Sequence, residues 1–310
     1  MTEASTIAVS AETGAAGGDV TDAPRSLTSD AWRSLKKNPI FWVSVVLIAL
    51  FLLMAAWPSL FTSTDPSAAV LKDARVPPNA DAWFGRDIQG YDIYSRTIYG
   101  ARASILVGVF TTVATVIIGG ALGMLSGFYG GWLDAVVSRI TDMFFAIPLL
   151  LGGILFMSVK PNDANTPYFV VVGKVVLVLA IFGWPSLARL MRSSVLQVKP
   201  NDYVQAARAL GASPWRIMKS HVLPNAVAPM IVVATINLGV FISVEATLSF
   251  LGIGLTPPAI SWGVAISDAL LAFRTTPHIL FFPSLFLSLA VLAFIMLGDA
   301  VRDAFDPKSR

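Results

Sequence analysis

Long apolar stretches dominate this chain, and polar residues gather between them. Six such stretches occur, at residues 40–61, 103–125, 143–159, 168–188, 226–244 and 279–297. The first holds 22 uncharged residues, which would extend about 33 Å as an α-helix. That length is enough to cross the roughly 30 Å hydrocarbon core of a bilayer, and it exceeds the apolar region of a secretory signal. The pattern predicts an all-α polytopic membrane protein with six transmembrane helices, the first of them an uncleaved anchor.

The polar segments divide the chain further. Residues 1–32 show no recurring pattern of large apolar residues, so they cannot offset the entropy cost of ordering, and we expect a disordered tail. An amino-terminal segment with the first span (33–61) follows. An outer segment (62–102), a core with five spans (103–299) and a carboxyl-terminal tail (300–310) complete the chain.

The distribution of basic residues predicts the orientation. Six spans place both termini on the same side, and cytoplasmic segments carry an excess of Lys and Arg. The residues before the first span (1–39), the 126–139 turn, the 189–225 loop and the carboxyl-terminal tail together hold 14 of the 22 Lys and Arg residues. We therefore predict that both termini and the 189–225 loop are cytoplasmic, and that residues 62–102 are extracytoplasmic.

Composition excludes several other classes of protein. Charged residues make up 13% of the chain, against roughly 25% in soluble domains, and a formal net charge of +3 is too small to indicate nucleic-acid binding. The absence of cysteine removes disulfides, thiolate ligands and cysteine nucleophiles. The two histidines, His221 and His278, fall in loops on opposite sides of the membrane. We expect neither a metal site nor a catalytic constellation.

Glycines and prolines indicate how the spans pack. Gly119, Gly123 and Gly127 recur every four residues, which places them on one helical stripe where a neighbouring backbone can approach closely. Ordinary helix association explains this face without any role in transport. Pro148 and Pro185 remove backbone hydrogen bonds and favour kinks in the third and fourth spans.

The 189–225 loop is long for a turn, and its pattern predicts two short helices. The first opens near residue 202, with Tyr203, Ala207 and Leu210 on one apolar stripe, and stops at Gly211. Ser213 caps the second, and the Leu223-Pro224 pair breaks it before the fifth span. Exposed apolar helices of this kind are typical of docking to another protein. An alternative is an interfacial helix on lipid, for which Trp215, Arg216 and Lys219 would also serve.

The 203–225 sequence resembles the "EAA" loop of the permease subunits of ABC importers. It carries Tyr203-Val-Gln-Ala-Ala-Arg-Ala-Leu-Gly-Ala-Ser, then Ile217 and His221-Val-Leu-Pro-Asn225. Three other segments narrow the resemblance to the C-type permease of dipeptide and oligopeptide importers. They are Phe84-Gly-Arg-Asp87 to Tyr99-Gly-Ala-Arg102, Glu245-Ala-Thr-Leu-Ser-Phe-Leu-Gly-Ile-Gly254 to Ser261-Trp-Gly263, and Leu297-Gly-Asp-Ala-Val-Arg-Asp-Ala-Phe-Asp-Pro307.

This resemblance implies a type I ABC importer permease fold in the plasma membrane of a prokaryote. It implies half of a translocation pathway for oligopeptides or dipeptides, completed by a second homologous permease. Two ATP-binding subunits and an extracytoplasmic peptide-binding protein would be further partners. Nickel or nickel-chelate importers share the motifs and remain an alternative. A secondary transporter or channel, a different class, would have no use for the two-helix loop.

The resemblance also implies roles within the loop. The first short helix would insert into a groove on the ATP-binding subunit, with Ala206 and Ala207 permitting close approach and Gly211 forming the turn. Leu223 and Pro224 would belong to the same coupling region. Gln205 stands where the family usually has Glu, so it keeps a hydrogen-bond acceptor but loses the charge.

The chain lacks the glycine-rich loop that cradles ATP phosphates. Its only Gly-Lys pair, Gly173-Lys174, is followed by Val175 and lies in an apolar span. We therefore expect no cofactor on this chain, no catalytic residues of its own, and ATP with Mg²⁺ on the partner subunits.

Three other features remain open. Glu245 would lie about 30 Å along the fifth span, at its outer edge, as a gate or helix-packing residue, a substrate contact or a solvated group. Lys174 is expected to extend its amine outward to the membrane surface. The stretch from Ile93 to Ala101 is amphipathic and is expected to lie along the outer interface.

Overall fold

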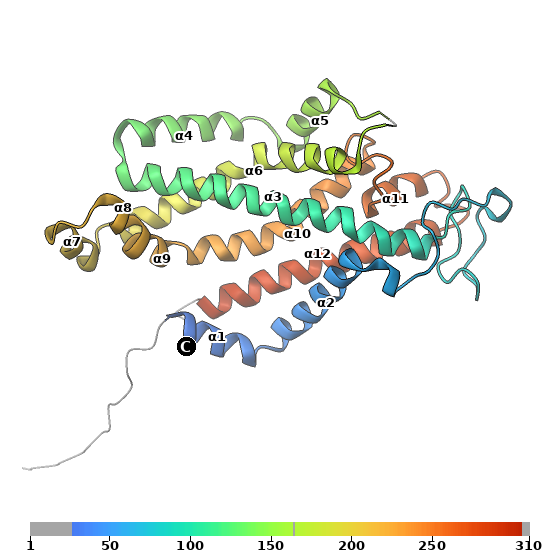
Figure 1. The fold of residues 1–310 in the computed structure, drawn as a ribbon, viewed down its shortest axis with the longest axis horizontal. Helices are drawn as coiled ribbons and strands as arrows, with labels where there is room; N and C mark the ends of the chain where they lie inside the picture. Colours follow the sequence, from blue (N-terminus) through green and yellow to red (C-terminus); the bar gives the residue numbers. More distant parts are fainter. Residues whose placement is uncertain (1–26, 164, 306–310) are drawn as a thin grey trace, which may run out of the picture.

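The computed structural model describes residues 27–163 and 165–305, and these fold into helices without any β-strand (Figure 1). The α-helices are α1 (Leu27–Lys37), α2 (Pro39–Ala56), α3 (Ile93–Tyr129), α4 (Gly131–Phe145), α5 (Leu149–Val159), α6 (Tyr168–Val198), α7 (Asp202–Ala209), α8 (Pro214–Ile217), α9 (Leu223–Ala226), α10 (Ala228–Phe250), α11 (Trp262–Ala269) and α12 (His278–Phe305). A π-helical turn, Met218–Val222, joins α8 to α9. Two short 3-10 turns, Pro58–Leu60 and Leu71–Asp73, lie between α2 and α3.

Five of the described helices are long and apolar enough to cross a membrane: α2, α3, α6, α10 and α12. The third predicted span, 143–159, is not a single helix. It is divided between α4 and α5, whose axes meet at 84° across a short break. Pro148 precedes α5 there; proline cannot donate a backbone hydrogen bond, and it disfavours the helical conformation of the residue before it. The predicted kink is therefore a complete break.

Helix ends also differ from the sequence-based bounds. α2 ends at Ala56, because Trp57 leaves the helical conformation ahead of Pro58. α1 includes residues 27–32, which the sequence assigned to the tail, and α12 includes residues 300–305. Residues 1–26 and 306–310, the rest of both predicted tails, lie outside the described residues.

The expected interfacial helix at 93–101 is wrong, because this stretch forms the first turns of the 37-residue α3. Asp92 caps that helix by accepting a hydrogen bond from the Ser95 amide at 2.7 Å. Ile98 and Ala101 are fully buried and pack in a cluster with Phe51 of α2 and Trp262 of α11. The apolar face of the stretch is therefore covered by protein.

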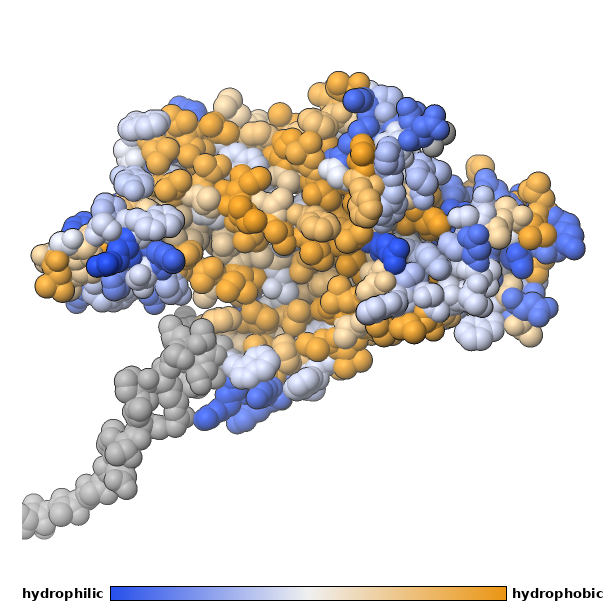
Figure 2. Space-filling view, viewed as in Figure 1, coloured by the Kyte–Doolittle hydropathy of each residue, from blue (hydrophilic) through white to orange (hydrophobic). Residues whose placement is uncertain are grey.

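The long helices run side by side along the longest axis of the molecule (Figure 1). α1, the end of α12 and the α7–α8 region lie toward one end, at the left of the view, and the 62–92 segment lies at the other. Apolar surface covers the middle of the visible face, while polar residues concentrate toward the ends (Figure 2). This distribution fits a protein whose middle part lies in the hydrocarbon core of a membrane.

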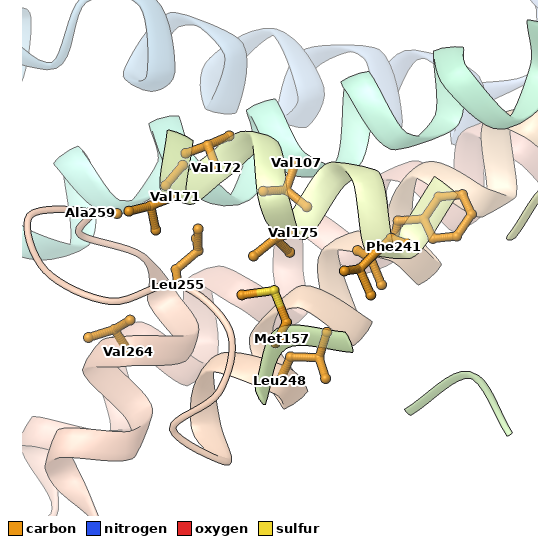
Figure 3. Packing of buried hydrophobic residues seen from close by; sticks show 13 residues of the cluster. Val107, Met157, Val171, Val172, Val175, Phe241, Leu248, Leu255, Ala259 and Val264 are labelled. Carbon is orange, nitrogen blue, oxygen red and sulfur yellow. The ribbon is translucent and has the colours of Figure 1, made fainter. Parts of the chain in front are cut away.

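One core cluster joins helices from distant parts of the chain (Figure 3). Val107 of α3, Met157 of α5, Val175 of α6 and Leu248 of α10 pack there with Leu255 from the loop after α10. A second cluster fills the α7–α8 end, where Met191 and Val195 of α6 meet Val204 of α7 and Ile217 of α8.

The three spaced glycines of α3 lie against α6. A Cβ added to Gly119 would stand 2.7 Å from the Trp184 carbonyl oxygen, and one on Gly127 would stand 2.9 Å from the Val195 Cβ. A Cβ on Gly123 would collide with the Ala188 carbonyl oxygen. Because backbone atoms cannot move aside as flexible side chains do, glycine is needed for this close contact.

We predict that Gly123→Ala destabilises the protein by about 1–3 kcal/mol, because the added methyl group meets the α6 backbone. Gly173→Ala is the matched control, since it lies in α6 with no atom within 4 Å of an added Cβ. The control should be neutral or gain up to about 1 kcal/mol in helix propensity. Unfolding in detergent measures both; equal stabilities would contradict the close contact.

Candidate functional site

The connecting segment, residues 199–227, joins α6 to α10 at the left end of Figure 1. The predicted helix break at Leu223-Pro224 is wrong. Leu223 opens α9 and Pro224 lies in its first turn, directly after the π-helical turn. Val227, which separates α9 from α10, also has helical dihedrals. The chain is therefore helical almost without interruption from Pro214 to Phe250.

Helix α7 is held from its inner face. Val204 is fully buried and Ala207 nearly so, and both pack in the cluster formed with α3, α6 and α8. Tyr203 and Leu210 remain 42% and 88% exposed. The predicted apolar stripe is therefore split, because Ala207 faces inward while the larger members stay in contact with solvent. Ala206 and Gln205 are also exposed.

The turn between α7 and α8 depends on Gly211. Its φ of 78° lies in the left-handed region, where glycine is unstrained. The Gly211 amide donates to the Arg208 carbonyl, and the Ala212 amide donates to the Ala207 carbonyl, which together form a Schellman motif. No atom lies within 4 Å of an added Cβ. Gly211 is needed for its backbone conformation, while the space beside it is open.

Gln205 ties α7 to the end of α6. Its Nε2 donates to the carbonyl oxygen of Lys199, the residue that caps α6, at 3.0 Å. Lys199 in turn donates from Nζ to the Phe128 carbonyl of α3 at 2.7 Å. A glutamate at position 205 has no hydrogen to donate, so Gln supplies a contact that the usual family residue cannot make. The sequence analysis noted the retained acceptor and the lost charge of Gln205, but not its capacity to donate.

Two ion pairs fasten α4 to α6. The Arg192 guanidinium forms a bidentate pair with Asp134, at 2.5 and 2.7 Å, and Arg189 Nη2 lies 2.6 Å from Asp142 Oδ1. The sequence analysis missed both pairs. The available signal was opposite charge just before the third predicted span and just after the fourth, but sequence alone did not place these segments in register.

At the opposite end, Glu245 is fully buried near the end of α10. Its Oε1 accepts a hydrogen bond from Ser249 Oγ at 2.8 Å, and Ser249 Oγ accepts one from the Leu255 amide at 2.9 Å. Glu245 takes part in none of the ion pairs of the described residues. Full burial contradicts the solvated alternative. The observed contacts connect α10 to the loop that follows it.

The rest of this motif brings α11 against α10 and α3. A Cβ on Gly263 would stand 2.6 Å from the Ala246 Cα, and one on Gly254 would stand 2.6 Å from Ser249 Oγ. The Trp262 indole donates to the Thr97 carbonyl of α3 at 2.9 Å. Two of the four segments on which the resemblance rested, 84–102 and 245–263, therefore pack against each other at this end.

The 62–102 segment is held by charged residues. Arg96 lies between Asp87 and Asp268, at 3.6 and 3.9 Å, and its guanidinium stacks over the Tyr91 ring. Burial raises the pKa of Asp268, and Arg96 opposes that shift. Arg102 donates from Nε to the Ala55 carbonyl at the end of α2.

Lys174 extends its amine out of α6 toward the loop before it. Nζ donates to Asn162 Oδ1 at 2.8 Å and to the Lys160 carbonyl at 3.2 Å. His221 lies in the π-helical turn and His278 at the start of α12. Within the described ranges, no group of three or more His, Cys, Asp or Glu side chains is placed to hold a metal ion.

Five of the described helices, or six if α4 and α5 form one broken span, could cross a membrane. The chain belongs to the family of the binding-protein-dependent transport system inner membrane component, whose model matches residues 119–310. A second family, the N-terminal TM domain of oligopeptide transport permease C, matches residues 26–78. Family membership confirms the resemblance to ABC importer permeases and sets aside the secondary transporter.

Curated relatives cover nearly the whole chain. The oligopeptide transport system permease protein OppC of Bacillus subtilis (strain 168) is 40% identical, over 92% of this chain and 91% of its own. The dipeptide transport system permease protein DppC of Alkalihalophilus pseudofirmus is 36% identical, over 91% and 90%. The glutathione transport system permease protein GsiD of Pectobacterium atrosepticum is 35% identical, over 89% and 90%.

Solved structures show the same fold. A chain of a methionine ABC transporter in an inward-facing conformation aligns with a TM-score of 0.54 at 21% identity, covering 67% of this chain and 96% of that one. A chain of an amino acid ABC transporter aligns with a TM-score of 0.51 at 18% identity, covering 66% and 91%. The predicted ABC importer permease fold is confirmed.

We predict that Glu245→Ala lowers stability by about 2–4 kcal/mol, because it opens a cavity and leaves the Ser249 hydroxyl without its acceptor. Glu245→Gln retains an oxygen for that hydrogen bond and should stay close to the original stability. Thermal unfolding of the purified protein compares the two. If Gln destabilises as much as Ala, the carboxyl group itself and not its hydrogen bond holds this junction.

Proposed function

We propose that this chain forms half of a translocation pathway for oligopeptides or dipeptides and is driven by two partner ATP-binding subunits. A second homologous permease would complete the pathway, and an extracytoplasmic peptide-binding protein would deliver the substrate. The names of the oligopeptide and dipeptide permeases that resemble this chain support the substrate class. The glutathione permeases support a peptide-like substrate as well, since glutathione is a small peptide.

One structural observation carries the coupling role. Helix α7 is anchored through Val204 and Ala207, while Tyr203 and Leu210 expose apolar surface to solvent. Anchored helices with exposed apolar residues are suited to a groove on another protein. We assign that groove to an ATP-binding subunit, with Gln205 and Ala206 on the exposed part of the same helix.

Movement of the docked helix would reach the membrane by two routes. Gln205 and Lys199 connect α7 to the ends of α6 and α3. The helical run from α8 through α9 connects the same segment to α10, with Leu223 and Pro224 inside the run. Closing of the ATP-binding subunits would thereby shift α6 and α10 together and alternate access to the pathway. ATP and Mg²⁺ would bind only to the partner subunits.

The orientation belongs to the same proposal. Both termini and the connecting segment would face the cytoplasm of a prokaryotic cell, and residues 62–92 would face outward. The basic residues support this, since 14 of the 22 fall in the segments assigned to the cytoplasm. The structure adds that α1, the end of α12 and α7 lie toward the same end of the molecule (Figure 1).

We predict that Gly211→Pro leaves the complex assembled but uncouples ATP hydrolysis from peptide uptake. Proline cannot adopt the φ of 78° and lacks the amide that bonds to Arg208, so the turn that positions α7 is lost. Gly211→Glu strains the same backbone, whereas Gly211→Asn tolerates the left-handed region and is the control.

The measurement uses the complex purified through this subunit and reconstituted in liposomes. Mass spectrometry should find a second permease and ATP-binding subunits, and candidate peptides should stimulate ATPase activity in the original protein and in Gly211→Asn. Normal peptide uptake by Gly211→Pro at normal abundance would contradict the coupling role. Recovery of an active homo-oligomer without ATP-binding subunits would contradict the proposed function as a whole.

A further inference from the structure

A groove of about 440 Å³ opens between α3, α6, α10 and the π-helical turn, at the same end of the molecule as α7. This volume is within the range of about 300–1,000 Å³ that is typical of small-molecule sites. Four methionines line it, and each comes from a different element: Met124 from α3, Met191 from α6, Met218 from the π-helical turn and Met230 from α10. Unbranched thioether side chains adapt their shape to flexible apolar ligands.

The rim of this methionine groove is polar on one side only. Lys219 lines it, is exposed, and has neither an ion pair nor a side-chain hydrogen bond among the described residues. Arg216, one turn earlier, is likewise exposed without a side-chain partner in the described part of the chain. Trp215, 68% exposed, completes the rim. Trp beside Lys or Arg is typical of the level at which lipid headgroups meet hydrocarbon.

We propose that the methionine groove binds one anionic phospholipid, with an acyl chain among the four methionines and the phosphate at Lys219. The groove and the lipid have matching apolar and charged parts. The apolar walls come mostly from the membrane-spanning helices α3, α6 and α10, and the charged Lys219 lies in the π-helical turn outside these helices. The unpaired amine of Lys219 complements the charge of a phosphate, and the apolar walls complement an acyl chain.

Comparison with a second groove shows that an unpaired cation distinguishes the methionine groove. It is larger, about 810 Å³, lies between α2, α3 and α6, and contains Arg102. That guanidinium already donates to the carbonyl oxygens of Ala55 and Ala56. Because its cation is occupied within the protein, the larger groove lacks the open headgroup site that Lys219 provides.

The proposed lipid site would make the two interpretations of the connecting segment, docking to a protein and contact with lipid, compatible. Tyr203 and Leu210 on α7 would contact the protein partner. Trp215 and Lys219 on the following turns would lie at the membrane surface. A lipid held there would contact the π-helical turn, α3 and α10 at once. Assignment of the lipid to the cytoplasmic leaflet depends on the orientation proposed above, whereas lipid binding itself does not.

Retention of phosphatidylglycerol tests the proposal. The assembled complex is reconstituted in nanodiscs of phosphatidylcholine with phosphatidylglycerol, extracted in detergent, and its bound lipids are counted by native mass spectrometry. The original protein should retain one more phosphatidylglycerol molecule than the Lys219→Gln variant. The apparent affinity of the variant for phosphatidylglycerol should be about fivefold lower. Lys36→Gln, which removes an exposed basic residue of α1, is the matched control and should retain the lipid.

Ala121→Trp provides a second variant, because Ala121 lines the groove from an exposed position and a large ring there would occupy the acyl-chain site. It should lose the same lipid molecule while Lys219 remains. Equal retention by the original protein and by both groove variants would overturn the proposal, and so would retention of phosphatidylcholine in equal amount. The readout involves neither peptide uptake nor ATP hydrolysis, so its failure is distinguishable from failure of the proposed function.

Discussion

The close contact between α3 and α6 is the interaction on which the other parts of the structure depend. Gly119, Gly123 and Gly127 remove every side chain from one stripe of α3, so the α6 backbone lies directly against it. In a membrane, where apolar surface gains little by leaving lipid, such contact between backbones is a principal source of helix association. The contact fixes the end of α6, where Lys199 bonds to α3 and α7 begins.

At both ends of the molecule, other elements are held against the α3–α6 pair. At one end, α7 and α8 are anchored to α3 and α6 by buried Val204 and Ile217. At the other, Trp262 donates to the α3 backbone, and Glu245 links α10 to the loop that precedes α11. The hydrogen bonds of Glu245 Oε1, Ser249 Oγ and the Trp262 indole are made within the protein, as the low dielectric of a membrane favours. The connecting segment is thus packed against the long helices, and it presents Tyr203 and Leu210 to solvent.

The sequence predicted these features unevenly, for physical reasons. Apolar length and glycine spacing are local properties, so five spans, the α3 packing stripe and the turn at Gly211 could be recognised directly. The break at Pro148 could not be distinguished from a kink, because its size depends on what surrounds the freed carbonyls. The hydrogen bond from Gln205 and the ion pair of Arg192 with Asp134 depend on tertiary register, which one sequence does not contain.

The central claim is that α7 docks on an ATP-binding subunit, and photo-cross-linking at Leu210 tests it most directly. Leu210 is 88% exposed, so a benzoyl-phenylalanine there should not disturb the anchored face of α7. Leu271, 90% exposed and after α11, is the control at the opposite end. The account predicts that the Leu210 probe, and not the Leu271 probe, forms an adduct with an ATP-binding subunit in the assembled complex. Adducts of the Leu210 probe with lipid alone, or with no ATP-binding subunit, would contradict it.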